Sequence, residues 1–200
     1  LADESKENGI SINLGPGGNL HRNILCGRHP EYYSEDPILT GTLMAYQARG
    51  LEENGVIATY KHLIANNMEF ERKSAHGIID ENTLRDLYLR VFDKAFSLYK
   101  PGCVMTSYNP VNGIYPCENS ALLNDLLRDE WGFDGFVMTD WGSYDTADSI
   151  RSVCAGTNLL TPGSKKHFRM ILKAVKRNEI SKAALQHSVK QIMKVLVRCI

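Results

Sequence analysis

Short apolar runs alternate with longer amphipathic stretches along most of the chain. Five runs, at 10–14, 56–59, 103–107, 136–139 and 157–160, are typical of buried strands. The stretches between them predict helices with one buried stripe each. Repeated strand-then-helix order implies a parallel sheet with right-handed crossovers. The pattern therefore predicts an α/β fold, and five strand–helix units without an internal break favour part of a (β/α) barrel.

The predicted helices carry start and stop signals. Asp36-Pro37 opens one helix, which Gly55 closes. Asp80 is the expected cap of a second helix, whose buried stripe lies within 84–95. A third helix is expected from Asn119 or Ser120 to Gly132, a fourth after Asp145, and two more in the tail from about 166 to 200, where Ser181 caps the last one.

Polar residues follow the predicted strands at their C-terminal ends. The run 136–139 ends on Asp140, although a buried strand has no use for a carboxylate. Trp141 comes next and offers a flat apolar face of the kind that stacks on sugar rings. Lys61-His62 and Tyr108 follow two other runs, after 59 and 107. Because the C-terminal ends of parallel strands meet on one face, these side chains are expected to converge there.

Each candidate also has a purely structural interpretation when it is taken alone. Gly15-Pro16-Gly17-Gly18 could be only a tight turn, and it lacks the glycine spacing of a dinucleotide site. Asp140 could be a helix cap, and Tyr108 a core aromatic. Arg28 could be a solvated loop residue, Lys61 a surface cation and His62 a hydrogen-bonded histidine. The functional interpretation rests on the convergence of all five features, with Lys61-His62 counted as one.

A carboxylate buried beside a sugar needs cations and hydrogen-bond donors to stay ionised. Arg28, Lys61 and His62 can supply them, and Arg72 can add to the same field. The sequence has no glycine–lysine phosphate loop and no His/Asp cluster with metal-ligand spacing. The combination therefore predicts a carbohydrate site without a metal or cofactor.

Composition narrows the partners and the compartment. The 23 basic and 23 acidic residues balance, so nothing favours nucleic acid or an anionic membrane surface. No apolar run approaches the ~20 residues of a membrane span. The five cysteines (Cys26, Cys103, Cys117, Cys154 and Cys199) are scattered, which predicts free thiols and favours a reducing, cytoplasmic compartment. The first residues show neither an initiator Met nor a signal-peptide pattern, so we expect the interior of a longer chain.

Several motifs in sequence order resemble one known family. The matching stretches are LGPGGNL (14–20), CGRHPEYYSEDP (26–37), GVIATYKHLIANNMEFER (55–72), CVMTSYNPVNGIYPCEN (103–119), LLRDEWGFDGFVMTDWG (126–142) and AGTNLLTPG (155–163). The chain resembles the catalytic barrel of glycoside hydrolase family 3, in its β-glucosidase branch. The resemblance implies that residues 1–200 form about five βα units of a (β/α)8 TIM-type barrel.

The resemblance also implies a mechanism and a set of site residues. Asp140 would be the nucleophile of a retaining β-glucosidase that releases terminal, non-reducing β-D-glucosyl residues through a covalent glycosyl-enzyme. Residues that would line the −1 sugar subsite are Arg28, Lys61, His62, Met105, Tyr108 and Trp141. Trp141 after the aspartate resembles the glucosidase pattern rather than the xylosidase one. The loop at 61–67 lacks the second histidine of the family's N-acetylglucosaminidases.

Two features of the family are expected outside these 200 residues. One is a sugar-binding aspartate upstream, and the other is the glutamate acid/base of a second α/β sandwich domain. Glu69, Glu118 and Glu130 match no acid/base position, so the isolated chain is expected to be inactive. The expected partners are β-glucosides or short β-gluco-oligosaccharides. Two alternatives stay open: a non-catalytic or degenerate sugar-binding fragment, and an enzyme of the same family that acts on a β-xyloside or β-galactoside.

Overall fold

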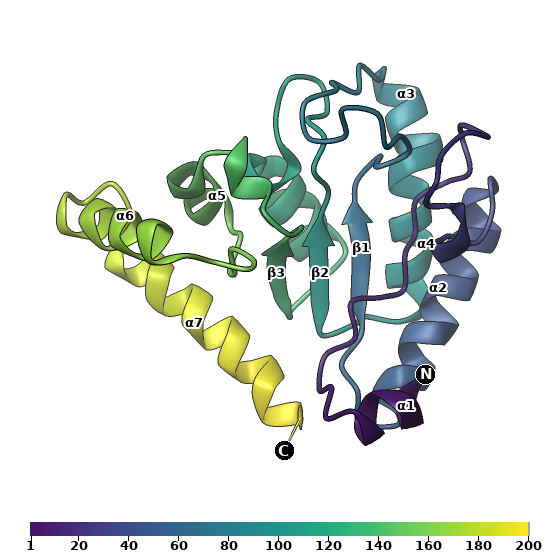
Figure 1. The fold of residues 1–200 in the computed structure, drawn as a ribbon, viewed down its shortest axis with the longest axis horizontal. Helices are drawn as coiled ribbons and strands as arrows, with labels where there is room; N and C mark the ends of the chain where they lie inside the picture. The colour runs from purple at the N-terminus through teal and green to yellow at the C-terminus, as the bar shows by residue number, and fades with distance from the viewer. Residues whose placement is uncertain (200) are drawn as a thin grey trace.

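A parallel sheet of three strands forms the centre of the computed structural model, which describes residues 1–199. The strands β1 (Thr59–Leu63), β2 (Cys103–Thr106) and β3 (Phe136–Thr139) stand side by side in chain order (Figure 1). β2 and β3 pair in unbroken register, whereas the register of β1 against β2 shifts between Tyr60 and Leu63. The predicted α/β fold with a parallel sheet is confirmed at this level.

Two further segments extend the sheet through single bridges. Ile12 pairs with Ile57 and Gly17 with Lys61 on one edge, and Leu159 pairs with Met138 on the other, all in parallel. The runs predicted as strands at 10–14 and 157–160 therefore lie where a parallel order requires, but they are bridged segments rather than full strands.

The strand predicted at 56–59 lies further along the chain, at Thr59–Leu63. Ile57 exchanges backbone hydrogen bonds with Ser11 and Asn13 of the 10–14 segment, and the backbone then continues through the buried Tyr60 and Leu63. Lys61 and His62 were expected beyond the strand end and instead lie inside β1. Apolar runs locate a strand better than they locate its last residue.

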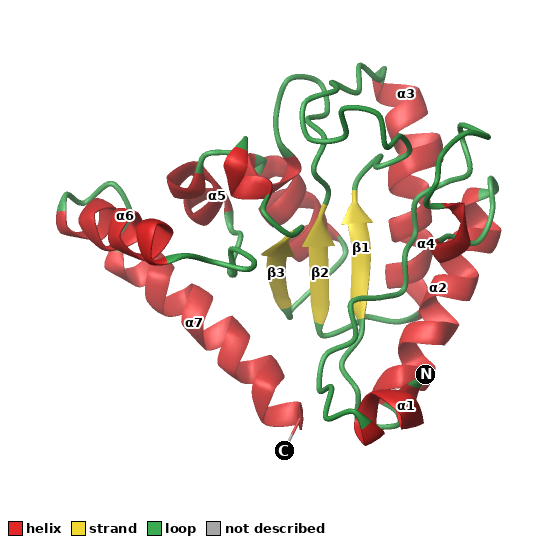
Figure 2. Cartoon of the chain, in the orientation of Figure 1, coloured by secondary structure: helices red, strands yellow, loops and turns green. Residues whose placement is uncertain are grey.

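The helices follow the sheet order and cover its sides (Figure 2). Their bounds are α1 Ala2–Glu7, α2 Pro37–Glu52, α3 Glu81–Thr83, α4 Arg90–Leu98, α5 Ser149–Ala155, α6 Lys165–Lys176 and α7 Lys182–Leu196. Two segments are π-helical. η2 (Leu84–Leu89) continues directly from α3, and η4 (Ala121–Glu130) begins after Ser120. Short 3₁₀ turns are η1 His29–Glu31, η3 Pro116–Glu118, η5 Ser143–Asp145 and η6 Val197–Cys199.

Side-chain caps start three helices where the sequence predicts them. Asp36 accepts a hydrogen bond from the Leu39 N–H, Asp80 from Thr83, and Ser181 from Ala184. The helix expected after Asp145 begins only at Ser149, because Asp145 belongs to the turn η5 and Asp148 provides the cap. Ile200, the last residue of the predicted tail, lies outside the described residues. Cys26, Cys117 and Cys154 are free thiols, as predicted, and Cys199 falls outside the described side chains.

Alternate residues of the strands point into two separate apolar clusters. Val104, Val137 and Tyr60 face the layer of α2, α4 and η4. Met105 and Met138 face the opposite side, where the end of α7 contributes Val195. In Figure 1, α7 crosses diagonally from the β3 side toward the lower ends of the strands. Helices therefore pack on the first face, and the end of α7 contacts the second.

Two glycines let the sheet close at the start of β2 and β3. The Phe136 N–H donates to the Gly102 carbonyl at 3.1 Å, which brings the backbones of Gly102 and Gly135 together. A Cβ on Gly135 would lie 2.1 Å from the Gly102 carbonyl oxygen. This contact sets how β3, and thus the segment after it, lies against β2.

We expect Gly135→Ala to destabilise the protein by about 3 kcal/mol, because the added methyl group meets backbone that cannot turn away. Gly50→Ala in α2 is the matched control, since a Cβ there meets nothing within 4 Å. The control should gain about 0.5–1 kcal/mol from reduced backbone freedom in the unfolded chain. Urea unfolding measures both, and equal stability of the two variants would contradict the close approach.

Candidate active site

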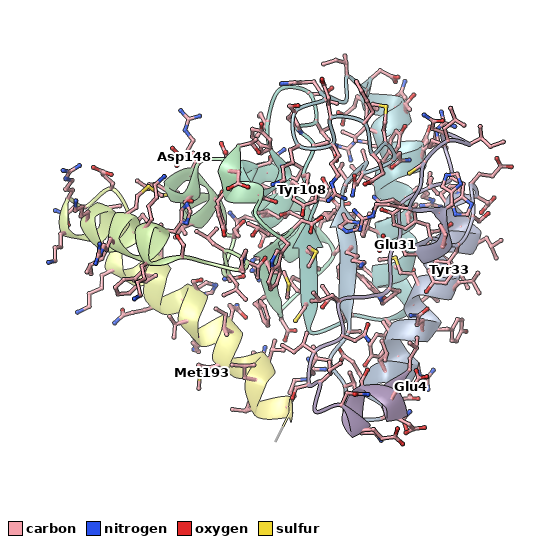
Figure 3. All side chains as sticks on the ribbon, in the orientation of Figure 1. Glu4, Glu31, Tyr33, Tyr108, Asp148 and Met193 are labelled. Carbon is pink, nitrogen blue, oxygen red and sulfur yellow. The ribbon has the colours of Figure 1, made fainter. Side chains whose placement is uncertain are left out.

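The predicted site residues gather at the C-terminal edge of the sheet. Tyr108 lies just above the arrowhead of β2, and Glu31 lies beside β1 (Figure 3). His62 comes from β1 and Asp140 from the residue after β3, and their Nε2 and Oδ2 atoms are 3.4 Å apart. Residues 78 positions apart in sequence therefore meet, as the parallel order predicts.

Asp140 is a buried carboxylate with one oxygen hydrogen-bonded and the other buried without a hydrogen-bond partner in the described part of the chain. It is 7 % exposed. The Trp141 N–H donates to Oδ1 at 2.6 Å, and the Ser143 N–H and Oγ donate to the Asp140 carbonyl. Oδ2 has no hydrogen-bond partner among the described residues. Since Asp148 caps α5, the interpretation of Asp140 as a helix cap is not supported.

Burial and nearby hydrogen-bond donors and cations shift the pKa of Asp140 in opposite directions. Burial raises its pKa above the usual 3.8, and the Trp141 N–H, the Arg28 charge and Tyr108 oppose that rise. The net direction is upward. A carboxylate in this setting is poorly solvated, which suits a nucleophile more than a surface ion.

His62 is a buried, neutral neighbour of Asp140. Only 1 % of it is exposed, and burial together with the charges of Arg28, Lys61 and Arg72 holds its pKa well below 6.5. Arg28 Nη2 lies 2.9 Å from its Nε2. The histidine thus has its hydrogen bonds satisfied, as the structural interpretation expects, and still faces the candidate nucleophile.

Glu31 joins the two basic residues that the sequence places at the site. Its Oε1 lies 2.5 Å from Arg28 Nε, and its Oε2 lies 2.9 Å from Lys61 Nζ. Burial works against ionisation, but the hydrogen bonds from Arg28 and Lys61 lower the pKa of Glu31. Glu31 and Lys61 also border a cavity of about 310 Å³ with Pro16 and Tyr32. Arg28 is therefore an ordered part of the site rather than a solvated loop residue.

Tyr108 sits against both the candidate nucleophile and a cation. Its hydroxyl donates to the Trp141 carbonyl at 2.7 Å. Burial, followed by the negative charge of Asp140, raises the pKa of Tyr108 to about 12. The Arg72 guanidinium lies 4.8 Å from the centre of the Tyr108 ring and pairs with Glu69 at 2.8 Å. Tyr108 stays neutral and fixes the turn that carries Asp140.

The two remaining predicted residues differ in position. Trp141 is 57 % exposed, so its ring is accessible beside Asp140. Met105 is buried on β2, where it packs with Met138 on the sheet face opposite the α2, α4 and η4 layer. It forms the apolar floor below the polar edge. Within residues 1–199, no group of three or more His, Cys, Asp or Glu side chains could hold a metal ion, and no helix of that range is long and apolar enough to span a membrane.

Sequence reasoning missed two residues that organise this edge. Asn19 contacts His62 through three hydrogen bonds, and Glu31 links Arg28 to Lys61. In the sequence, Asn19 is only the polar residue that follows a glycine-rich turn. The signal for Glu31 was its spacing of three residues from Arg28 across Pro30, which places both side chains on one side of the turn η1.

We expect Asp140→Asn to raise the free energy of unfolding at pH 7. The folded pKa of Asp140 is raised, so its protonation adds stability below the unfolded value of 3.8, and that contribution is lost as pH rises through the folded pKa. Asparagine keeps the acceptor for Trp141 and removes the buried charge. The gain over wild type should therefore shrink as pH falls toward 3.8.

Asp148→Asn is the control, because it replaces an exposed capping carboxylate by another good cap. Its effect should stay within about 0.5 kcal/mol at both pH values. Urea unfolding at pH 7 and pH 4 measures the three proteins. An Asp140→Asn protein less stable than wild type at pH 7 would show that the donors outweigh burial.

Comparison with known proteins agrees with the sequence resemblance. The family model described as the glycosyl hydrolase family 3 N terminal domain matches residues 1–195. Thermostable beta-glucosidase B of Acetivibrio thermocellus is 41 % identical over 197 residues, which are 98 % of this chain and 26 % of that protein. A beta-glucosidase of Rhizobium radiobacter is 40 % identical over 200 residues, covering 99 % and 24 % of the two chains.

Solved structures show the same relationship in three dimensions. Beta-glucosidase 3B from Thermotoga neapolitana in complex with glucose superimposes with a TM-score of 0.94 at 40 % identity, over 98 % of this chain and 28 % of that one. The chain spans about a quarter of the length of the curated relatives it matches. The family model covers almost the whole chain, so the chain belongs to glycosyl hydrolase family 3, within the N-terminal domain of that family.

Proposed function

We propose that this chain carries the nucleophile of a retaining β-glucosidase, with Asp140 in that role. The observation that carries the proposal is the buried Asp140 carboxylate, whose Oδ2 lies without a hydrogen-bond partner among the described residues and 3.4 Å from the neutral His62. Similar proteins named beta-glucosidases support the reaction class.

The proposed chemistry takes two displacements at the anomeric carbon. In the first, Asp140 Oδ2 forms a bond to C1, the bond from C1 to the leaving oxygen breaks, and that oxygen takes a proton from an acid. In the second, water attacks C1 and gives its proton to the conjugate base of that acid, and the Asp140 carboxylate leaves. Both steps pass through positive charge at C1, which an ionised, poorly solvated carboxylate stabilises.

The remaining candidates would bind and orient the sugar. Arg28 and Lys61 present donors to hydroxyl groups, and their shared contact with Glu31 restricts their motion. His62, buried and neutral, would hold Arg28 in place through the contact between Nε2 and the guanidinium. The accessible Trp141 ring would stack on a sugar face, while Tyr108 holds the turn and Met105 supports it from below.

The acid/base of this proposal comes from a second domain, as in the family resemblance. Retention requires a second carboxyl group about 5–5.5 Å from the first. Glu69 pairs with Arg72, and Glu118 accepts from the Asp148 N–H at 2.6 Å. Each carboxylate has one oxygen bonded to a neighbouring group, which supports an acid/base from outside this chain.

We further propose that the chain forms about five βα units of a (β/α)8 barrel, with residues 1–200 belonging to one catalytic domain. The parallel order of the 10–17 segment, β1, β2, β3 and the segment at 157–161 supports this arrangement. Every one of these segments presents its C-terminal end to the same edge, where barrel enzymes place their chemistry.

Labelling should identify the nucleophile directly. A 2-deoxy-2-fluoro-β-glucoside with a good leaving group slows the second displacement more than the first, so we expect a trapped glycosyl-enzyme on Asp140 of the full-length protein. Peptide mass spectrometry locates the adduct. Labelling at any other residue, or release of the α-anomer first in an NMR time course, would sink the assignment.

Asp140→Asn should lower kcat/KM for an aryl β-glucoside by on the order of 10⁴-fold or more, as expected for loss of a nucleophile. Asp148→Asn, which changes an exposed acid outside the site, should retain activity within about twofold. A panel of β-glucoside, β-xyloside and β-galactoside substrates then ranks the sugars. A clear preference for the xyloside or galactoside would replace glucose in the proposal.

The 200-residue chain assayed alone should show no turnover of the β-glucoside, because the nucleophile has no proton donor in position. Circular dichroism on the same sample checks that it is folded. Turnover by the chain alone, abolished by Asp140→Asn, would show that the acid lies within these residues.

A further inference from the structure

The side chain of Asn19 forms hydrogen bonds with both the backbone and the imidazole ring of His62. Asn19 Nδ2 donates to the His62 carbonyl at 2.9 Å, and Asn19 Oδ1 accepts from the His62 N–H at 3.0 Å. The same Oδ1 lies 2.9 Å from His62 Nδ1. Both residues are almost completely buried, at 2 % and 1 % exposure.

The backbone of His62 fixes which atom of the Asn19 amide is the oxygen. A flipped amide would place its NH₂ group against the His62 N–H and its oxygen against the His62 carbonyl, so two hydrogen bonds would become two repulsions. The atom that faces His62 Nδ1 is therefore an acceptor. It requires a proton on Nδ1.

The other edge of the ring gives the same answer independently. Arg28 Nη2 lies 2.9 Å from His62 Nε2, and a guanidinium nitrogen only donates. Nε2 must therefore accept and carry no proton. Tyr32 Oη, 3.3 Å from Nδ1, can share the Nδ1 proton because its own hydroxyl donates to the Asn66 carbonyl.

We propose that Asn19 is a positioning residue that holds His62 as the neutral Nδ1–H tautomer, with an unprotonated Nε2 facing Asp140. The inference rests on the proposed function for its catalytic meaning. A proton on Nε2 would be donated to Asp140 Oδ2, 3.4 Å away, and would occupy the lone pair that attacks the sugar. With Nε2 unprotonated and accepting from Arg28, Oδ2 keeps that lone pair.

The charged groups around the ring favour the same state. Arg28, Lys61 and Arg72 all oppose a positive charge on His62, and Asp140 is the carboxylate that faces it. Tyr32, whose pKa burial raises, stays neutral beside Nδ1. The cations keep the ring neutral, and Asn19 selects which nitrogen holds the single proton.

Nitrogen-15 NMR of histidine-labelled full-length protein tests the tautomer without any substrate. His62→Gln identifies the His62 signals by their loss. In wild type at pH 7 we expect a protonated Nδ1 and an unprotonated Nε2, and the ring should still be neutral at pH 6.5, where an ordinary histidine is half charged. A protonated Nε2 in wild type, in either the neutral or the charged ring, would overturn the proposal.

Asn19→Asp places a carboxylate against Nδ1 and should raise the pKa of His62 toward or above 6.5, so that both nitrogens carry protons at mildly acidic pH. We expect kcat/KM for the β-glucoside to fall about 10²-fold in a variant that circular dichroism shows to be folded, because the Nε2–H group then donates to Asp140. Asn54→Asp, where the exposed amide donates to the Gly50 carbonyl in α2, is the matched control and should leave the His62 spectrum unchanged.

An unchanged His62 tautomer and pKa in folded Asn19→Asp would contradict the positioning role. The wild-type spectrum remains decisive if that variant does not fold. Failure of the proposed function shows instead as fluoroglucoside labelling away from Asp140, which the NMR measurement neither needs nor predicts.

Discussion

The burial of one carboxylate governs how the rest of this edge is built. Asp140 ends a strand inside an α/β layer, where an unpaired ion is costly. Three cations and two further carboxylates surround it, namely Arg28, Lys61 and Arg72 with Glu31 and Glu69. Each cation is shared with an acid other than Asp140. The surrounding positive charge therefore lowers the cost of burying Asp140. It does so without a direct ion pair to Oδ2, which would make that oxygen a weaker nucleophile.

This arrangement of charges around Asp140 depends on a backbone whose position is closely fixed. The turn after β3 is held by the Trp141 N–H, by Ser143 and by the Tyr108 hydroxyl, and each of these bonds comes from a residue already fixed by the sheet or its neighbouring loop. At the other end of the strands, the contact between Gly102 and Gly135 sets the distance between β2 and β3. Rigid strands and short hydrogen-bonded turns thus place the candidate nucleophile, rather than long flexible side chains.

Local signals explain what could be predicted from the sequence. The caps Asp36, Asp80 and Ser181 act within three residues, so their patterns are visible in the chain itself. Buried apolar runs located β2 and β3, and parallel order brought His62 and Asp140 to one edge. The end of β1, the π-helical segments and the Asn19–His62 contact depend on partners 40 or more residues away or on packing against other elements. Such features leave no local pattern.

His62 shows why the structural and functional interpretations of a residue need not compete. Its hydrogen bonds to Asn19 and Arg28 satisfy a buried ring, as any core histidine requires. The same bonds also decide where its proton lies, because one partner can only accept and the other can only donate. Satisfying the ring therefore fixes an acceptor nitrogen beside Asp140. A histidine that titrated freely here would gain a proton as pH falls and would donate it to Oδ2. The hydrogen bonds that stabilise the buried ring therefore also keep the Oδ2 lone pair free for attack on the sugar.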